Sequence, residues 1–320
     1  MIREKNMKRQ NYLAHDGKNI SLVIWDEVKN PKAIIQISHG MVEHALRYEK
    51  FAAEMNARGY IVAADDHRAH GETDRETLGY SAGNIWENTL KDLDGISKKL
   101  KSEYGLPLFL LGHSYGSFLT QAYLERYADN LCGAIVGGSN KLKRSAVVFG
   151  KFFADTGCFF GAENKPANFI KVNTFDVYNK KYKDGTTFIS SIESECRRYE
   201  KDELCSFVCS NNFYRCFFGG AKKLYTRKSA AGLRRDLPLL LISGDADPVG
   251  EYGKGVKRLY EFYKKSGVKN VQLKLYKGVR HEYFNDVCSA ETMRDVAEFV
   301  EKTLSAAENN QVKNAGKNIQ

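Results

Sequence analysis

Residues 107–127 read PLFLLGHSYGSFLTQAYLERY, and this stretch decides the fold class. Residues 108–111 form the large apolar run of a buried strand, and residues 114–127 have the apolar spacing of an amphipathic helix. GHSYG, at 112–116, joins the two. A serine between such a strand and helix sits on a tight, strained turn, which needs glycines two residues to either side. The pattern therefore predicts that the Ser114 hydroxyl projects above the end of a strand.

The same alternation of strands and helices extends in both directions from this turn. We expect further strands at 20–25, 33–38, 60–64, 131–136, 238–243 and 271–276, and further helices at 48–58, 88–104, 253–265 and 291–304. Short apolar strands separated by amphipathic helices are typical of crossover connections in a parallel sheet. The chain is therefore predicted to have an α/β fold with a mainly parallel sheet.

The alternation stops after Gly138 and resumes at about 237. Residues 139–236 contain helical patches and glycine-containing joins but no run of buried-strand type. This pattern predicts an insertion. The expected organisation is a first core part at 1–138, the insertion at 139–236, a second core part at 237–306, and a flexible polar tail at 307–320.

Charge and aromatic residues are concentrated in the insertion. Residues 140–230 hold 17 Lys and Arg against 9 Asp and Glu, a surplus of 8 within a formal net charge of +10. They also hold 17 of the 38 aromatic residues. A basic, aromatic segment could contact an anionic lipid surface transiently. Equally, it could be a solvated charged face over a small core of its own.

Composition argues against several other classes. The seven cysteines are an odd number without CxxC spacing, so neither a disulfide framework nor a zinc site is expected. No apolar run is long enough to span a bilayer, and residues 1–17 lack the apolar stretch of a secretory signal. No nucleic-acid-binding module is present despite the basic charge. We expect a soluble, cytoplasmic protein that does not bind nucleic acid.

A serine hydroxyl becomes nucleophilic when a histidine, oriented by a carboxylate, removes its proton. His281 follows the expected strand at 271–276 across a short loop, where such a base should emerge. Two carboxylates follow the strand at 238–243. We choose Asp247, which precedes a proline that stiffens the loop, and keep Asp245 as the alternative because it could simply cap the turn.

Ester cleavage also needs two backbone N–H groups directed at the oxyanion. Tyr115 should supply one, and Met41, in the loop after the strand at 33–38, should supply the other. His39 and His44 in that loop have no carboxylate or cysteine at ligand spacing, so the sequence does not indicate a metal site. No cofactor is expected.

These residues resemble the monoacylglycerol lipase and lysophospholipase branch of the α/β-hydrolase superfamily, which is sometimes grouped with serine aminopeptidase-like hydrolases. The matching motifs are HGMVEH at 39–44, DHRAHG at 66–71, GHSYG at 112–116, SGDADPVG at 243–250 and GVRHEYFND at 278–286. The resemblance implies a doubly wound sheet of about eight strands with a mobile helical cap, or lid, inserted after the sixth. By position, Ser114, Asp247 and His281 match the family's triad, and Met41 and Tyr115 match its oxyanion donors. Ala69 and Tyr115 depart from the residues that relatives commonly carry.

The expected activity is hydrolysis of a carboxylic ester through an acyl-enzyme, with a monoacylglycerol or a lysophospholipid as the small-molecule substrate. The many aromatic residues of the insertion would suit an acyl chain. The same triad also serves peptidases, thioesterases and acyltransferases. A non-catalytic ligand-binding protein with this fold is the remaining alternative.

Overall fold

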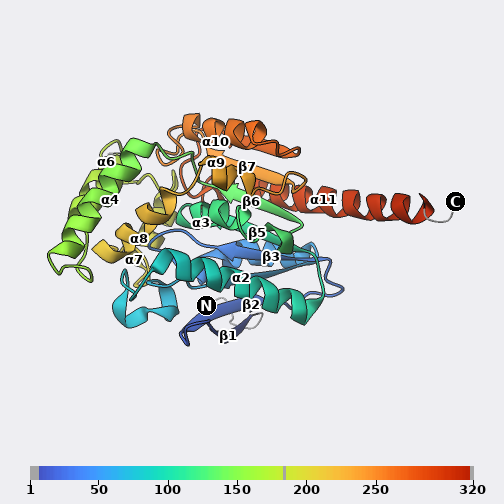
Figure 1. The fold of residues 1–320 in the computed structure, drawn as a ribbon, viewed down its shortest axis with the longest axis horizontal. Helices are drawn as coiled ribbons and strands as arrows, with labels where there is room; N and C mark the ends of the chain where they lie inside the picture. The colour runs from blue at the N-terminus through green and yellow to red at the C-terminus, as the bar shows by residue number, and fades with distance from the viewer. Residues whose placement is uncertain (1–6, 183–184, 318–320) are drawn as a thin grey trace.

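The computed structural model describes residues 7–182 and 185–317, and in these residues eight strands form a single sheet (Figure 1). The strands are β1 (Lys8–Leu13), β2 (Asn19–Trp25), β3 (Ala33–Ser38), β4 (Tyr60–Asp65), β5 (Leu108–His113), β6 (Gly133–Gly137), β7 (Leu239–Gly244) and β8 (Val271–Tyr276). Their order across the sheet is β1-β2-β4-β3-β5-β6-β7-β8. Strands β3 to β8 run parallel, while β2 is antiparallel to both neighbours. The expected fold class is confirmed.

Helices cover both faces of the sheet. One face carries α2 (Ile85–Tyr104), α3 (Tyr115–Leu124) and α10 (Lys254–Lys265), and the other carries α1 (Glu49–Ala57) and α11 (Ser289–Lys317). Side chains alternate between the faces along each strand, so Ile34 joins one core and Ile35 the other. Strands β3 to β7 are buried throughout, as the uninterrupted apolar runs predicted.

Both ends of the sequence differ from expectation. β1 was not predicted, because its sequence KRQNYL is mostly exposed and polar and lacks an apolar alternation. At the other end, α11 was expected to stop near Leu304 but continues to Lys317 and projects beyond the body of the molecule (Figure 1). The tail expected at 307–320 is therefore helical as far as Lys317. Residues 318–320 lie outside the described part of the chain.

Residues 139–236, hereafter the insert, connect β6 to β7, and most of their helices gather at one end of the molecule (Figure 1). Their helices are α4 (Arg144–Phe159), α5 (Asn168–Lys171), α6 (Val177–Asn179), α7 (Glu193–Lys201), α8 (Asn211–Ala221) and α9 (Arg227–Ala231). The α8 helix packs against both α4 and the core helix α2. Within the described residues, no helix is both long and apolar enough to cross a membrane.

Candidate active site

Ser114 occupies a sharp turn between β5 and α3. Its backbone has φ +51° and ψ −118°, a conformation that costs energy for any residue with a Cβ. A Cβ on Gly112 would collide with Thr120 and Gly116, and one on Gly116 would collide with the Ser38 carbonyl oxygen. The two glycines therefore let this turn form against the neighbouring strand, and Ser114 remains partly accessible.

His281 and Asp247 lie in line with the Ser114 hydroxyl. The distance from Ser114 Oγ to His281 Nε2 is 2.8 Å, and the distance from His281 Nδ1 to an Asp247 carboxylate oxygen is 3.0 Å. A carboxylate can only accept, so Nδ1 carries the proton and Nε2 is free to accept the serine proton. The fold thus brings together three residues that are far apart in sequence.

The position of Asp245 distinguishes it from Asp247. Asp245 is exposed, and its carboxylate accepts a hydrogen bond of 2.7 Å from the N–H of Gly278. Asp247 is fully buried, and its carboxylate accepts from the Val249 N–H at 2.8 Å as well as from His281. Asp245 therefore caps a turn, and Asp247 is the carboxylate that contacts the histidine.

The charge of Asp247 governs the protonation of His281. Burial alone lowers the pKa of an imidazole, but the charge of Asp247 and its hydrogen bond outweigh this effect and raise the pKa of His281 above the ordinary value of 6.5. A more basic imidazole accepts a proton more readily. The arrangement therefore favours the step in which Ser114 is deprotonated.

The loop after β3 lies directly against Ser114. A Cβ on Gly40 would come within 3.2 Å of the Ser114 Cβ, so the backbone that leads into Met41 is close to the Ser114 side chain. On the other side, Tyr115 is the first residue of α3, where backbone N–H groups have no intrahelical acceptor. The two expected oxyanion donors thus belong to segments that flank the hydroxyl.

Buried histidines, whose function the sequence did not indicate, hold this loop in place. His39 accepts a hydrogen bond at Nε2 from the His67 N–H, at 2.9 Å, and therefore donates from Nδ1 to the Gly40 carbonyl, at 2.7 Å. The His67 ring stacks on His39 and bonds to Asp65 and Ser38. Burial holds the pKa of His39 well below its usual value, so it stays neutral. The motifs HGMVEH and DHRAHG were the available signal, because they contain both partners.

Glu43 and Arg47 connect the loop to the neighbour of His281. Glu43 accepts hydrogen bonds from the Gly40 N–H at 2.5 Å and from the Tyr48 hydroxyl at 3.0 Å. Arg47 pairs with Glu43 at 3.3 Å and also with Glu282. The buried side chains of this network are those of Glu43, Arg47, Tyr48 and Glu282. Together they fix the loop relative to the segment that carries His281.

The insert contacts the site through its main chain. The N–H groups of His281 and Glu282 donate to the carbonyls of Phe188 and Ile189, at 3.1 and 2.8 Å, and the Phe188 ring lies 5.6 Å from the His281 ring. Beside them is a cleft of about 250 Å³. Its apolar wall includes Val42, Phe175, Phe188, Ile189 and Phe207, and its polar residues include Lys171, Asp176, Asn179 and Glu200. The cleft therefore suits a molecule with both apolar and polar parts.

Known proteins of similar sequence and structure include lipases and esterases. Monoglyceride lipase of Mus musculus is 27% identical over 295 residues, which cover 91% of this chain and 90% of the mouse protein. A carboxyl esterase from Bacillus coagulans, solved with glycerol, superposes with a TM-score of 0.85 at 24% identity and covers 93% of this chain and 99% of its own. A soluble variant of monoglyceride lipase from Saccharomyces cerevisiae, solved with a substrate analog, has a TM-score of 0.73 at 18% identity over 95% of this chain and 98% of its own.

The family model described as serine aminopeptidase, S33, matches residues 29–287. This range includes the Ser114 turn, the loop with Met41, the insert, and the segments that carry Asp247 and His281. The match confirms the family resemblance seen in the sequence motifs. The chain belongs to the serine aminopeptidase S33 family of α/β-hydrolases.

Proposed function

We propose that this protein is a serine hydrolase that cleaves carboxylic esters of the monoacylglycerol type. The observation that carries the proposal is the chain of contacts from Ser114 Oγ to His281 Nε2, at 2.8 Å, and from His281 Nδ1 to Asp247, at 3.0 Å. A reactive serine needs this combination of an accepting nitrogen and an orienting carboxylate. The names of its relatives, monoglyceride lipases among them, support the same substrate class.

The proposed reaction has two acyl-transfer steps. Ser114 Oγ attacks the ester carbonyl while His281 Nε2 takes its proton, and the backbone N–H groups of Met41 and Tyr115 stabilise the oxyanion. Collapse breaks the bond to the alcohol, which leaves with the proton from His281. A water then attacks the acyl-enzyme by the same route, and the carboxylic acid is released.

The backbone around Ser114 supports the proposed oxyanion site. Tyr115 begins α3, so its N–H lies at the positive end of the helix dipole. The hydrogen bonds of His39 and Glu43 hold Gly40 in place, immediately before Met41. Donors that are already oriented need little reorganisation when charge develops, which is the main source of their effect.

For the substrate, we propose that the mixed cleft accepts an acyl ester with a small polar head. Its apolar wall, with Val42 and Phe188 nearest the catalytic segments, is suited to hydrocarbon, and its polar residues are suited to glycerol hydroxyls. A lysophospholipid would place a phosphate in the same region, where Lys171 is the cation of the lining. Hydrolysis rates on both classes distinguish them.

We further propose that the insert is a cap that meets a lipid surface, with 1–138 and 237–306 as the hydrolase core. Several of its apolar side chains are exposed, including Phe149, Phe152, Phe159 and Phe160, of which Phe159 is 84% exposed. These side chains lie on α4 or at its end. Exposed aromatic residues beside lysine and arginine are typical of segments that bind the surface of anionic membranes.

The state of the cysteines supports a cytoplasmic location for the protein. All seven are free thiols, and several are buried. Free thiols persist in the reducing cytoplasm, whereas exported proteins usually carry disulfides. Fractionation of cells that express the protein, with antibody detection, would place it in the cytosolic or membrane-associated fraction.

A substrate panel tests the proposed function. Purified protein is assayed with monoacylglycerols, lysophosphatidylcholine, p-nitrophenyl esters of increasing chain length, an acyl thioester and aminoacyl p-nitroanilides. We expect kcat/KM to be highest for a monoacylglycerol and to be at least a hundredfold lower for the anilides. Preferential cleavage of the anilides would instead assign a peptidase, and turnover of none of these substrates would favour a ligand-binding protein.

A further inference from the structure

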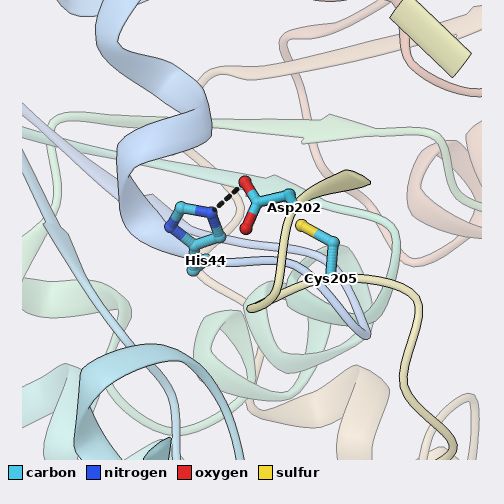
Figure 2. Close-up of side chains that lie close together, drawn as sticks. All are labelled: His44, Asp202 and Cys205. Carbon is cyan, nitrogen blue, oxygen red and sulfur yellow. Dashed lines mark hydrogen bonds and ion pairs between the residues drawn. The ribbon is translucent and has the colours of Figure 1, made fainter. Parts of the chain in front are cut away.

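Three side chains outside the catalytic residues form a compact cluster, shown in Figure 2: His44, Asp202 and Cys205. One ligand atom from each lies within 4.8 Å of the other two, and His44 Nε2 is 2.9 Å from Asp202 Oδ2. His44 and Cys205 are buried, whereas Asp202 is partly exposed. The cluster is therefore enclosed by protein but open to solvent on the side of Asp202.

The cluster joins two parts of the molecule. His44 belongs to the loop after β3 that also contains Met41, whereas Asp202 and Cys205 follow α7 in the insert. The sequence indicated no metal site because nothing at ligand spacing accompanied His44. Folding brings a carboxylate and a thiol to it from 158 positions away and beyond, a distance at which spacing rules give no signal.

The donor set matches the preferences of zinc. Imidazole nitrogen, carboxylate oxygen and thiolate sulfur are the three ligand types that Zn²⁺ binds in proteins, usually with tetrahedral geometry. Bond lengths of about 2.0–2.3 Å put neighbouring tetrahedral donors roughly 3.3–3.8 Å apart. Separations of 2.9 Å to at most 4.8 Å reach that range with small side-chain movements. A water would take the fourth position on the exposed side.

The surroundings already orient these ligands. The second carboxylate oxygen of Asp202 accepts a hydrogen bond of 2.9 Å from the Leu204 N–H, which leaves the first directed at His44. Such supporting contacts are typical of metal ligands. The guanidinium of Arg47 lies 3.9 Å from the Cys205 sulfur, but it is paired with Glu43 and Glu282. The charge of Arg47 is therefore balanced by two carboxylates.

We propose that His44, Asp202 and Cys205 bind a Zn²⁺ ion that ties the insert to the loop containing Met41. The thiol loses its proton to solvent on binding, so two anionic ligands balance the charge of the ion. Because the site exists only when the insert is docked on the core, bound zinc stabilises the docked arrangement. The ester hydrolysis proposed above uses no metal, so the two proposals can fail independently.

Metal binding to the full chain tests this site directly. Protein freed of metal by dialysis against a chelator is titrated with Co²⁺ as a spectroscopic probe and then with Zn²⁺ in competition with a chromophoric chelator. We expect one ion per chain, a thiolate-to-cobalt charge-transfer band, and a higher Tm with Zn²⁺. Cys205→Ser should abolish the band, and Asp202→Asn and His44→Gln should each weaken zinc binding at least tenfold, while Cys132→Ser, a half-buried cysteine elsewhere, should change nothing.

Alkylation of the wild-type protein gives a second test that does not depend on the folding of variants. One equivalent of Zn²⁺ should slow the reaction of Cys205 with iodoacetamide at least tenfold, measured by peptide mass spectrometry, with Cys132 and Cys158 as internal references. Unchanged alkylation of Cys205 would overturn the proposal. So would a cobalt band that persists in Cys205→Ser, or the absence of stoichiometric zinc binding at micromolar concentration.

Discussion

The carboxyl ends of the strands and the insert above them differ in what they leave exposed. Strands β3 to β7 are buried throughout, and the segments after β5, β7 and β8 hold Ser114, Asp247 and His281 in one line of hydrogen bonds. The insert instead carries eight of the eleven exposed large apolar side chains in the described residues. These are Val148, Phe149, Phe152, Phe159, Phe160, Phe169, Val172 and Val177.

We infer that the two regions have different functions. The carboxyl ends of the strands can hold reacting groups at distances that suit proton transfer, because each loop is anchored to a buried strand. A helical insert with apolar residues in solvent gains by covering them with substrate or lipid. We therefore expect mutations at the carboxyl ends of the strands to affect ester turnover or folding. Mutations of the exposed residues of the insert should instead affect lipid binding.

The largest expected effect is at Ser114, the proposed nucleophile. Ser114→Ala should lower ester turnover by roughly a thousandfold to a millionfold, since the group that forms the acyl-enzyme is removed. Steady-state hydrolysis of a p-nitrophenyl ester measures it, with Ser102→Ala, an exposed serine on α2, as the matched control. Turnover within tenfold of the wild type would contradict the assignment.

The two aspartates after β7 give the next largest contrast. Asp247→Asn should lower kcat by about a thousandfold to ten-thousandfold, because the amide no longer favours the tautomer and charge that His281 needs. Asp245→Asn should lower kcat by less than tenfold, because that carboxylate only accepts a hydrogen bond from the Gly278 N–H. If the two variants were equally impaired, Asp247 could not be the specific orienting acid.

Folding should respond differently to the same substitution at the two regions. Gly116→Ala places a Cβ against the Ser38 carbonyl and should lower the free energy of unfolding by about 3 kcal/mol. Gly219→Ala, on α8 in the insert, has open space and should raise it by roughly 0.5–1 kcal/mol. Denaturant unfolding followed by circular dichroism measures both. A neutral Gly116→Ala would mean that the turn is less tightly packed than described.

The exposed end of α4 should affect lipid binding and leave the chemistry unchanged. The double variant Phe159→Ser/Phe160→Ser should weaken binding to anionic phospholipid vesicles by about tenfold, since two exposed aromatic anchors are removed. Vesicle co-sedimentation gives the affinity, and hydrolysis of a short soluble ester should stay within twofold. Leu13→Ser, which removes an exposed side chain from β1 on the core, is the control. An equal loss of vesicle affinity in both variants would show that the exposed side chains of α4 do not specifically bind lipid.

The smallest expected effect is the position of the acidic limb of the pH profile. Protonated His281 cannot accept the serine proton, so activity is lost as the pH falls through the pKa of that imidazole. Because Asp247 raises this pKa, the midpoint of the limb in kcat/KM should lie above 6.5. In Asp247→Asn, the residual activity should show a midpoint at lower pH. A limb below 6.5 in the wild type would contradict the described coupling.

The sequence was most informative at the carboxyl ends of the strands. The apolar run before Gly112, the glycines around Ser114 and the loop after β8 predicted which segments would meet, because burial and backbone strain restrict the local sequence strongly. The sequence favoured Asp247 over Asp245 because of the proline that follows it, although both residues follow the same strand. Geometry favoured Asp247 through one contact, to His281 Nδ1.

Other features could not be predicted because they depend on long-range contacts. The bonds from Phe188 and Ile189 to the His281 segment, and the approach of Cys205 to His44, join residues with no periodic relation in the sequence. The strand β1 is too polar to show a core-facing pattern and forms only because β2 offers it an edge. The extension of α11 reflects weak local preferences that give no clear end signal.

The most direct test of the central claim is identification of the residue that a fluorophosphonate probe labels in the folded protein. We predict stoichiometric modification of Ser114, located by peptide mass spectrometry, and loss of labelling in both Ser114→Ala and His281→Ala. Ser102 should remain unmodified. Labelling of another residue, or equal labelling of Ser114 in His281→Ala, would contradict the claim that the imidazole activates this hydroxyl.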